Sequence, residues 1–241
     1  MTGKAKFRYF GHSTVMLTTE AGKTVMFDPW LEGNPRCPSE LYDPGPVDFI
    51  GLSHGHSDHT ASALSLAKKT KAKIFCNYEL GMILIKEGLP GTQYLQMNKG
   101  GTIPLGSGLH ATLTQAFHSS SYDAADGNTY YAGEPCGIVV RLESGRSVYF
   151  AGDTLLFGDM SLIARRHRPE VCFLPIGDRF TMGPEDAAEA AALLEAKIAV
   201  PIHFKTFDAL SGTADEFTAR AQERSPSSKI VTLEPGEEYT F

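Results

Sequence analysis

The stretch that decides the fold is residues 48–59, Asp-Phe-Ile-Gly-Leu-Ser-His-Gly-His-Ser-Asp-His. Its first part, 48–52, is mostly apolar and predicts a buried β-strand, and its second part follows the pattern H-x-H-x-D-H. With 8 His and 12 Asp in 241 residues, this pattern is expected by chance in about 4 of 10,000 such sequences. Chance is therefore a poor explanation, and the residue types indicate a metal site.

The spacing within the motif points to two metal ions. In an extended chain, residues i and i+2 face the same side, so the imidazoles of His54 and His56 can meet one ion. Asp58 and His59 follow after the chain has turned, and they face another direction that suits a second ion. A single mononuclear site would not need all four side chains.

Three further candidate ligands stand at the ends of predicted strands, namely His118, Asp153 and His203. Side chains at strand ends converge on a cleft at one edge of the sheets in α/β folds. Taken singly, a His at such a position is more often an ordinary hydrogen-bonded residue, and Asp153 after Gly152 also fits turn chemistry. Beside the motif, all three become candidate ligands, because two ions need more donors than the motif supplies.

The rest of the chain alternates predicted strands and helices. Strands are predicted over 6–10, 13–18, 24–27, 48–52, 73–76, 92–97, 110–117, 137–142, 147–151, 171–175, 198–202 and 229–233. Helices are predicted over 60–70, 79–87 and 159–167, from residue 184, and from a capping box at 213–216. The polar stretches 28–46 and 119–135 are predicted to be loops that cover the cleft. This order predicts an α/β protein with mixed sheets, in a single domain over residues 1–241.

Composition and charge exclude several classes of protein. The net charge of −6 provides no global positive field, which disfavours binding to nucleic acid. There is no apolar run of about 18 residues and no apolar stretch typical of a signal peptide, so we expect a cytoplasmic protein without a membrane span. The cysteines lack C-x-x-C spacing and are predicted to be buried free thiols. They are Cys37, Cys76, Cys136 and Cys172.

Together these features resemble the metallo-β-lactamase superfamily and, within it, the cytoplasmic metal-dependent hydrolases related to ascorbate-6-phosphate lactonase. The segments that carry the resemblance span nearly the whole chain in order. They are Gly11-His12-Ser13-Thr14, Phe27-Asp28-Pro29, the H-x-H-x-D-H segment, Met97-Asn98-Lys99-Gly100-Gly101, His118-Ser119-Ser120, Ala151-Gly152-Asp153-Thr154, Phe180-Thr181-Met182-Gly183-Pro184 and Pro201-Ile202-His203-Phe204. The resemblance implies the αββα sandwich of the metallo-β-lactamase fold, in which two mixed β-sheets are flanked by helices.

The resemblance also implies how the ligands divide between the ions. One ion is held by His54, His56 and His118, the other by Asp58, His59 and His203, with Asp153 bridging the two. The sequence departs from the usual pattern where His59-Thr60-Ala61 stands in place of a common Gly, and where Ser53 replaces a common Thr. These changes concern the local turn and the fit of the substrate, and they leave the ligands in place.

The chemistry predicted for such a site is hydrolysis. Two divalent ions about 3.5 to 4 Å apart share a water, lower its pKa and present a bridging hydroxide to a carbonyl or phosphorus atom. The sequence therefore predicts a dinuclear hydrolase of a small ester, lactone or phosphoester, with Zn²⁺ expected and Mn²⁺, Ni²⁺ or Fe compatible with the same ligands. His12 and Asp178 are candidate proton donors to the leaving group. Asp28 is predicted to orient a ligand imidazole.

Other functions remain open at this stage. An iron-dependent oxidoreductase on the same scaffold is compatible with imidazole and carboxylate ligands. A purely structural metal site is disfavoured, because such sites are usually closed and four-coordinate. An RNA-processing nuclease is disfavoured by the acidic balance and the lack of a basic arm. The expected partner is a small, anionic substrate molecule, with no nucleic acid and no membrane, and a homo-oligomer is compatible with the sequence.

Overall fold

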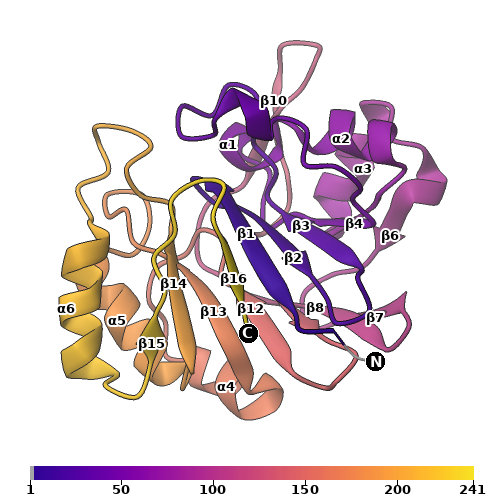
Figure 1. Cartoon of the computed structure of the whole chain (residues 1–241). Coiled ribbons are helices and arrows are strands. Elements are labelled where there is room, and N and C mark those ends of the chain that lie inside the picture. The colour runs from indigo at the N-terminus through magenta and orange to yellow at the C-terminus, as the bar shows by residue number, and fades with distance from the viewer. Residues whose placement is uncertain (1–2) are drawn as a thin grey trace.

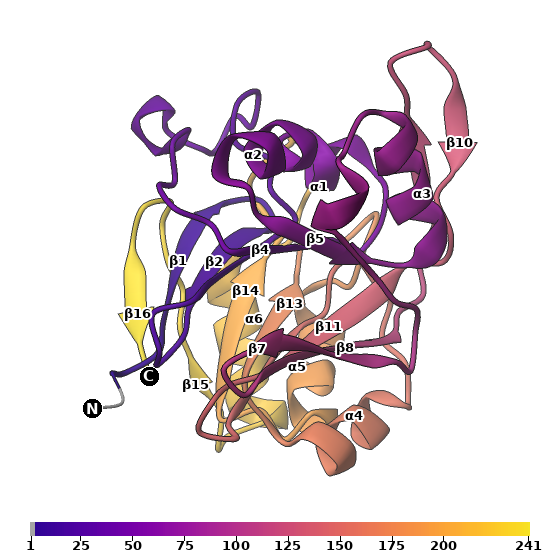
Figure 2. The ribbon, with the colours of Figure 1, turned by 90° about the vertical axis from the view of Figure 1, so that its right-hand side faces the viewer.

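The computed structural model describes residues 3–241 as two seven-stranded β-sheets that pack face to face (Figure 1). Figure 2 shows the layers in the order helices, sheet, sheet, helices. This arrangement confirms the αββα sandwich predicted from the sequence. No helix within residues 3–241 is long and apolar enough to cross a bilayer. All four cysteines are buried and unpaired, as predicted.

Each sheet is mixed, with one antiparallel half and one parallel half. The first sheet contains, in spatial order, β16 (Glu238–Thr240), β1 (Lys6–Gly11), β2 (Thr14–Thr18), β3 (Thr24–Phe27), β4 (Phe49–Gly51), β5 (Lys73–Cys76) and β6 (Tyr94–Gln96). The second contains β15 (Lys229–Ile230), β14 (Ile198–Ile202), β13 (Pro169–Pro175), β12 (Ser147–Phe150), β11 (Cys136–Arg141), β8 (Leu109–Gln115) and β7 (Thr102–Gly106). Strands β3 to β6 and β12 to β15 run parallel, so their carboxyl ends meet at one edge of each sheet.

The helices lie on the outer faces of the sheets. Helices α1 (Ser57–Thr60), α2 (Ala63–Thr70) and α3 (Tyr78–Lys86) cover the first sheet, and α4 (Met160–His167), α5 (Pro184–Leu193) and α6 (Ala214–Arg224) cover the second. Two 3-10 turns, η1 (Ser39–Leu41) and η2 (Gly91–Gln93), lie in connections. Helix α6 begins where the capping box predicts, because the side chain of Thr213 accepts a hydrogen bond from the backbone N–H of Glu216 at 3.2 Å.

The core between the sheets follows from the alternation of side chains along each strand. Phe27 of the first sheet stacks on Phe150 of the second, with ring centroids 4.9 Å apart. Phe7 meets Phe173 edge to face at the same separation. The neighbouring residue Met26 points to the other face and packs under the helices that cover the first sheet. This packing holds the two sheets in one relative position and brings their carboxyl edges together.

Several predicted elements differ from the structure. The helix predicted over 60–70 is two helices, and the first of them begins at Ser57, inside the motif. The chain is tied down between them, because Ser62 donates its N–H to the carbonyl of Pro29 and its Oγ accepts from the N–H of Leu31. Strand β8 ends at Gln115, so His118 lies three residues beyond the strand and does not end it.

The sequence also missed strands that are short and polar or that lie at sheet edges. Strands β7 and β16 were not predicted, and the stretch 119–135, predicted as a loop, contains the hairpin of β9 (Ser121–Asp123) and β10 (Thr129–Tyr131). The strand predicted over 92–97 starts as the turn η2 and becomes β6 only at Tyr94. These strands are defined by pairing with distant partners, so local periodicity is a weak guide to them.

Candidate metal centre

The H-x-H-x-D-H motif leaves the carboxyl end of β4 and turns directly into α1. His54 and His56 lie before the helix and face each other, with 2.9 Å between Nε2 of His54 and Nδ1 of His56. Asp58 and His59 lie inside α1 and point elsewhere, as the spacing predicted. Because α1 begins inside the motif, the side chains of His54 and His56 point in one direction and those of Asp58 and His59 in another.

Gly55 lets the neighbouring segment close over the motif. A Cβ at this position would lie 2.5 Å from Cβ of Ala132 and 2.7 Å from the carbonyl oxygen of Ser121. The N–H of Gly55 also donates to Oγ of Ser120 at 3.2 Å. The stretch 119–135 therefore packs against the motif.

The second sheet supplies His118, Asp153 and His203 to the same place. Oδ2 of Asp153 lies 3.1 Å from Nε2 of His203, 3.3 Å from Nε2 of His59, 3.7 Å from Nε2 of His118 and 4.0 Å from Nε2 of His54. The residue before Asp153 is Gly152, in left-handed backbone at φ 62°, where a Cβ would lie 2.5 Å from Cβ of Ser53. Close contact between the sheets thus requires glycine beside the central carboxylate.

The potential ligand atoms form adjoining groups, in each of which they lie within 4.8 Å of one another. One group is His54, His56 and His118, and a second is His12, Asp58, His59 and His203. A third, overlapping group is Asp28, His54 and His59. The first two groups are the division that the resemblance implied, with His12 added. Asp153 lies between them.

His12 is fully buried beside the second group. Its Nε2 lies 3.1 Å from Oδ2 of Asp58, and its Nδ1 lies 2.9 Å from Oγ1 of Thr206. The ring packs against His203, with centroids 4.1 Å apart, and meets Trp30 edge on. Burial, reinforced by nearby His203, lowers the pKa of His12 to about 4, so the ring is neutral at pH 7. A neutral His12 can donate a hydrogen bond to Asp58 and orient that carboxylate.

Asp28 occupies the position predicted for a residue that orients a ligand. Its Oδ2 is 2.8 Å from Nδ1 of His59, and its Oδ1 accepts the backbone N–H of Ser53 at 2.7 Å. Asp28, His59 and Ser53 are all buried. This bond leaves Nε2 of His59 directed towards Asp153, at 3.3 Å.

The structure does not bring Asp178 into these groups. Its carboxylate is exposed, and its Oδ2 accepts a hydrogen bond from Oγ of Ser211 at 3.1 Å. The preceding residue, Gly177, nevertheless packs against His203, because a Cβ there would lie 3.2 Å from Nδ1 of the imidazole. Asp178 therefore follows a residue that contacts the centre, with its own side chain in solvent.

Backbone strain gathers at this site in a way that the sequence does not reveal. His12, Asp28 and His203 all have left-handed backbone, with φ of 53°, 42° and 56°. For residues other than glycine, such conformations cost of order 1 to 3 kcal/mol each and persist only where the surroundings impose them. The strain is stored at residues that lie in or against the ligand groups.

The residues present fit a divalent metal centre. Nε2 of His59 and Oδ1 of Asp153 are buried without a hydrogen-bond partner among residues 3–241. Burial lowers the pKa values of His54, His56 and His118, aided by the neighbouring His59. Burial raises the pKa of Asp153, but His203 and His59 outweigh it and hold that pKa well below its usual range. Neutral imidazoles around an ionised carboxylate are the donor set that a divalent ion binds.

Comparison with known proteins gives the same assignment. Residues 23–204 match the beta-lactamase superfamily domain. The UPF0173 metal-dependent hydrolase of Rubrobacter xylanophilus is 44% identical, in an alignment that covers 99% of this chain and 97% of the relative. That of Herpetosiphon aurantiacus is 42% identical and covers 97% of this chain and 96% of the relative.

Comparison with solved structures points to the same superfamily as the sequence relatives. Igni18, a metallo hydrolase from the archaeon Ignicoccus hospitalis, superposes with a TM-score of 0.87 at 34% identity, covering 99% of this chain and 98% of its own. The metallo-beta-lactamase fold protein YhfI from Bacillus subtilis shares the fold, with a TM-score of 0.73 at 14% identity and 99% and 100% coverage. The chain therefore belongs to the beta-lactamase superfamily and, within it, to the UPF0173 metal-dependent hydrolases.

Proposed function

We propose that this metal-dependent hydrolase is dinuclear and acts on a small ester, lactone or phosphoester. The observation that carries the proposal is the position of Asp153, whose Oδ2 lies within 4.0 Å of an imidazole nitrogen of both ligand groups. A carboxylate that lies between two sets of imidazoles is suited to bridging two cations. The unpartnered Nε2 of His59 and Oδ1 of Asp153 support the same proposal.

In this proposal the ligands divide as the two groups of donor atoms do. His54, His56 and His118 hold one ion, and Asp58, His59 and His203 hold the other, with Asp153 shared. Zn²⁺ suits these imidazole and carboxylate donors, and Mn²⁺, Ni²⁺ or Fe suits them as well. When bound, the ions supply Lewis acidity that polarises the substrate oxygen and lowers the pKa of a water.

The surrounding residues have distinct roles in this proposal. His12 positions Asp58, because both ring nitrogens of His12 are engaged and the ring is fully buried. Asp28 positions His59 through Nδ1. Asp178 is proposed as the proton donor to the leaving group, since it follows Gly177, which packs against His203, and is not itself one of the grouped ligands.

The rim of the site suggests the form of the substrate. Exposed apolar side chains stand in the loops that carry or follow the ligands, at Phe117, Leu155, Phe180 and Phe207. Phe207 also packs on the ring of His12, with centroids 5.7 Å apart. An anionic group is attracted by two dications, and an apolar portion of the substrate can contact the rim. The resemblance to ascorbate-6-phosphate lactonase favours a lactone or phosphoester within this class.

The test is a substrate panel on protein whose metal content has been measured. We expect about two divalent ions per chain and hydrolysis of lactones, carboxylic esters, phosphodiesters or thioesters without dioxygen. Activity should rise with pH through an apparent pKa near about 7, where a water activated in such a site ionises.

Three outcomes would contradict parts of the proposal. Turnover that requires dioxygen, with iron bound, would indicate the oxidoreductase. Hydrolysis confined to long RNA would refute the small substrate. The dinuclear centre would be excluded if the protein binds only one ion per chain at saturation and if replacing His59 or His203 changes neither metal content nor activity.

A further inference from the structure

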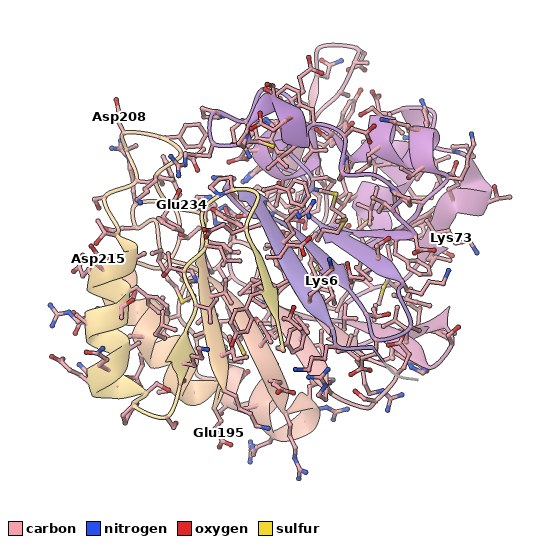
Figure 3. All side chains as sticks on the ribbon, viewed as in Figure 1. Lys6, Lys73, Glu195, Asp208, Asp215 and Glu234 are labelled. Atoms are coloured by element: carbon pink, nitrogen blue, oxygen red, sulfur yellow. The ribbon has the colours of Figure 1, made fainter. Side chains whose placement is uncertain are left out.

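A group of basic side chains lies at the opposite end of the strands from the metal centre. Helix α4 ends at His167, directly before β13 begins at Pro169, whereas the ligands follow the carboxyl ends of β12 and β14. Glu195, shortly before β14, lies at the bottom of the view in Figure 3, and Asp208, beyond His203, lies at the top. Figure 1, drawn in the same view, places α4 at the bottom. The region beside α4 is therefore separate from the ligand groups.

This region contains a pocket of about 490 Å³ with an unusual concentration of positive charge. Its basic lining residues come from α4, from the residue after it and from two strands of the second sheet. They are His110, Arg141, Arg165, Arg166, His167 and Arg168. No Asp or Glu among residues 3–241 lines this pocket. Four of the chain's 10 arginines thus meet in one place, although the chain carries a net charge of −6.

The four arginines are not neutralised by carboxylates within residues 3–241, since none of them forms an ion pair there. The nearby acidic residues Glu20 and Glu170 are paired with another arginine, Arg146. Nη2 of Arg141 instead lies 3.2 Å from Nδ1 of His110. Arginines that line one pocket without paired carboxylates leave it electropositive, which favours a bound anion.

Stabilisation of the helix end explains only part of this cluster. Basic residues in the last turn of a helix interact favourably with its dipole, which accounts for Arg165, Arg166 and His167. Arg141 comes from the end of β11, and Arg168 follows the helix in left-handed backbone at φ 46°. The dipole does not explain why these two line the same pocket.

An apolar pocket of about 380 Å³ adjoins the basic one. The two share Thr102, Thr112, Arg166 and His167 as lining residues, and the hydroxyl groups of the threonines lie 2.8 Å apart. The apolar half is lined by side chains that include Phe157, Leu162 and Ile163. Asp159 lines only this apolar half. The two pockets therefore adjoin, and we refer to them together as the groove, with a basic half and an apolar half.

We propose that this groove binds a small organic phosphate, of the kind represented by a nucleoside diphosphate. The phosphate groups would lie among Arg141, Arg166 and Arg168, because guanidinium groups bind phosphate oxygens in pairs. The apolar or aromatic part would lie beside Phe157 and Leu162. The volume of each half lies within the range typical of small-ligand sites, about 300 to 1,000 Å³, which favours a small molecule over a nucleic acid.

The test is calorimetric titration of the metal-loaded enzyme with ADP, pyrophosphate and adenosine as probes. The pocket variant is R141Q/R166Q, and the matched control is R220Q/R224Q on α6, which removes the same charge from exposed positions. We expect ADP to bind the wild type and the control alike, and to bind the pocket variant at least about tenfold more weakly. Pyrophosphate should bind more weakly than ADP, and adenosine more weakly still.

Other results would overturn the proposal. Absence of ADP binding to the wild type would exclude the site, and equal losses in both double variants would indicate a non-specific charge effect. ADP binding that survives R141Q/R166Q but is lost in Asp153→Asn would place the ligand at the metal centre. If pyrophosphate binds as tightly as ADP, the claim that the apolar half contacts the organic part of the ligand is refuted. Circular dichroism should show that both double variants remain folded, as expected for exposed side chains.

Discussion

Asp28 and His59 form a hydrogen-bonded pair in which Oδ2 of the carboxylate lies 2.8 Å from Nδ1 of the imidazole, and neither residue is exposed. On the other side of the ring, Asp153 faces Nε2 at 3.3 Å. Burial lowers the pKa of His59, but Asp153 and Asp28 outweigh it and hold the pKa well above its usual range. If His59 holds an ion as proposed, a cation on Nε2 would take the place of that proton and Asp28 would keep the ring oriented.

The pair predicts the effect of Asp28→Asn. The amide is neutral and supports His59 less strongly, so we expect metal affinity to fall by about 10- to 100-fold with the fold retained. Competition with a chelator measures the affinity. The matched control is Asp48→Asn, whose carboxylate contacts Lys23 and Thr24 in the same sheet. Equal affinities in wild type and Asp28→Asn would show that Asp28 does not position the ligand.

Asp153→Asn tests the shared carboxylate. The side-chain volume is almost unchanged, but a neutral amide cannot bridge two cations, so we expect a folded protein that retains less metal and little activity. Elemental analysis and turnover are the measurements. Asp208→Asn is the control, because Asp208 is exposed in the loop beyond His203 (Figure 3). Wild-type turnover with full metal content in Asp153→Asn would mean that this aspartate only shapes the turn.

Asp178→Asn tests the proposed proton donor. Its side chain lies outside the ligand groups, so we expect the variant to keep its metal and to lose turnover mainly on substrates with poor leaving groups. The loss expected for a general acid is about 10²- to 10⁴-fold. A comparison of kcat for leaving groups of different pKa is the measurement. An equal loss on all substrates, or loss of metal, would contradict this role.

Glu20 predicts a stability that depends on pH. It accepts hydrogen bonds from Oγ of Ser144 at 2.7 Å and from Nη2 of Arg146 at 2.6 Å, and these join a turn of the first sheet to a turn of the second. Burial raises the pKa of Glu20, but Ser144 and Arg146 outweigh it and leave the pKa below its usual value of 4.5. A lowered pKa stabilises the fold above pH 4.5, and this stabilisation is lost as the pH falls through the folded-state pKa.

We therefore expect Glu20→Gln to lower the free energy of unfolding by about 1 to 3 kcal/mol at pH 7. The difference from wild type should shrink as the pH falls through the lowered folded-state pKa, below which the carboxyl is protonated in both states. Urea denaturation at several pH values is the measurement. Glu185→Gln, at an exposed ion pair with Arg224, should change stability by less than about 1 kcal/mol. A pH-independent difference for Glu20→Gln would refute the electrostatic account.

Gly55→Ala tests the packing of the segment that covers the motif. The added Cβ would lie 2.5 Å from Cβ of Ala132, so we expect a loss of about 1 to 3 kcal/mol in unfolding free energy or displacement of the stretch 119–135. Thermal unfolding and limited proteolysis measure the two effects. Gly158→Ala is the control, because the added Cβ would meet nothing within 4 Å among residues 3–241 apart from its own chain neighbours. If Gly55→Ala changes neither the thermal unfolding nor the proteolysis pattern, the stretch 119–135 packs less tightly on the motif than the structure shows.

Local pattern predicted most of the strands that bury one or both faces, although many of their ends differ by one to three residues. The strands over 24–27, 73–76 and 198–202 have the bounds that the sequence predicted. The polar edge strand β16 was missed, because it is a strand only through its pairing with β1. The start of α1 at Ser57 was also missed, since no propensity in Ser-Asp-His-Thr predicts a helix without its neighbours.

The sequence by itself predicted an α/β architecture and identified the residues around Asp153, because metal ligation requires particular residue types and these follow predicted strands. Only the tertiary structure decided what lies beside them. His12 meets Asp58 across 46 positions of sequence, and Asp28 meets His59 across 31. The basic groove likewise joins Arg141 of one strand to the end of α4. Such contacts depend on how two sheets and their helices pack together, which the periodicity of a single segment does not encode.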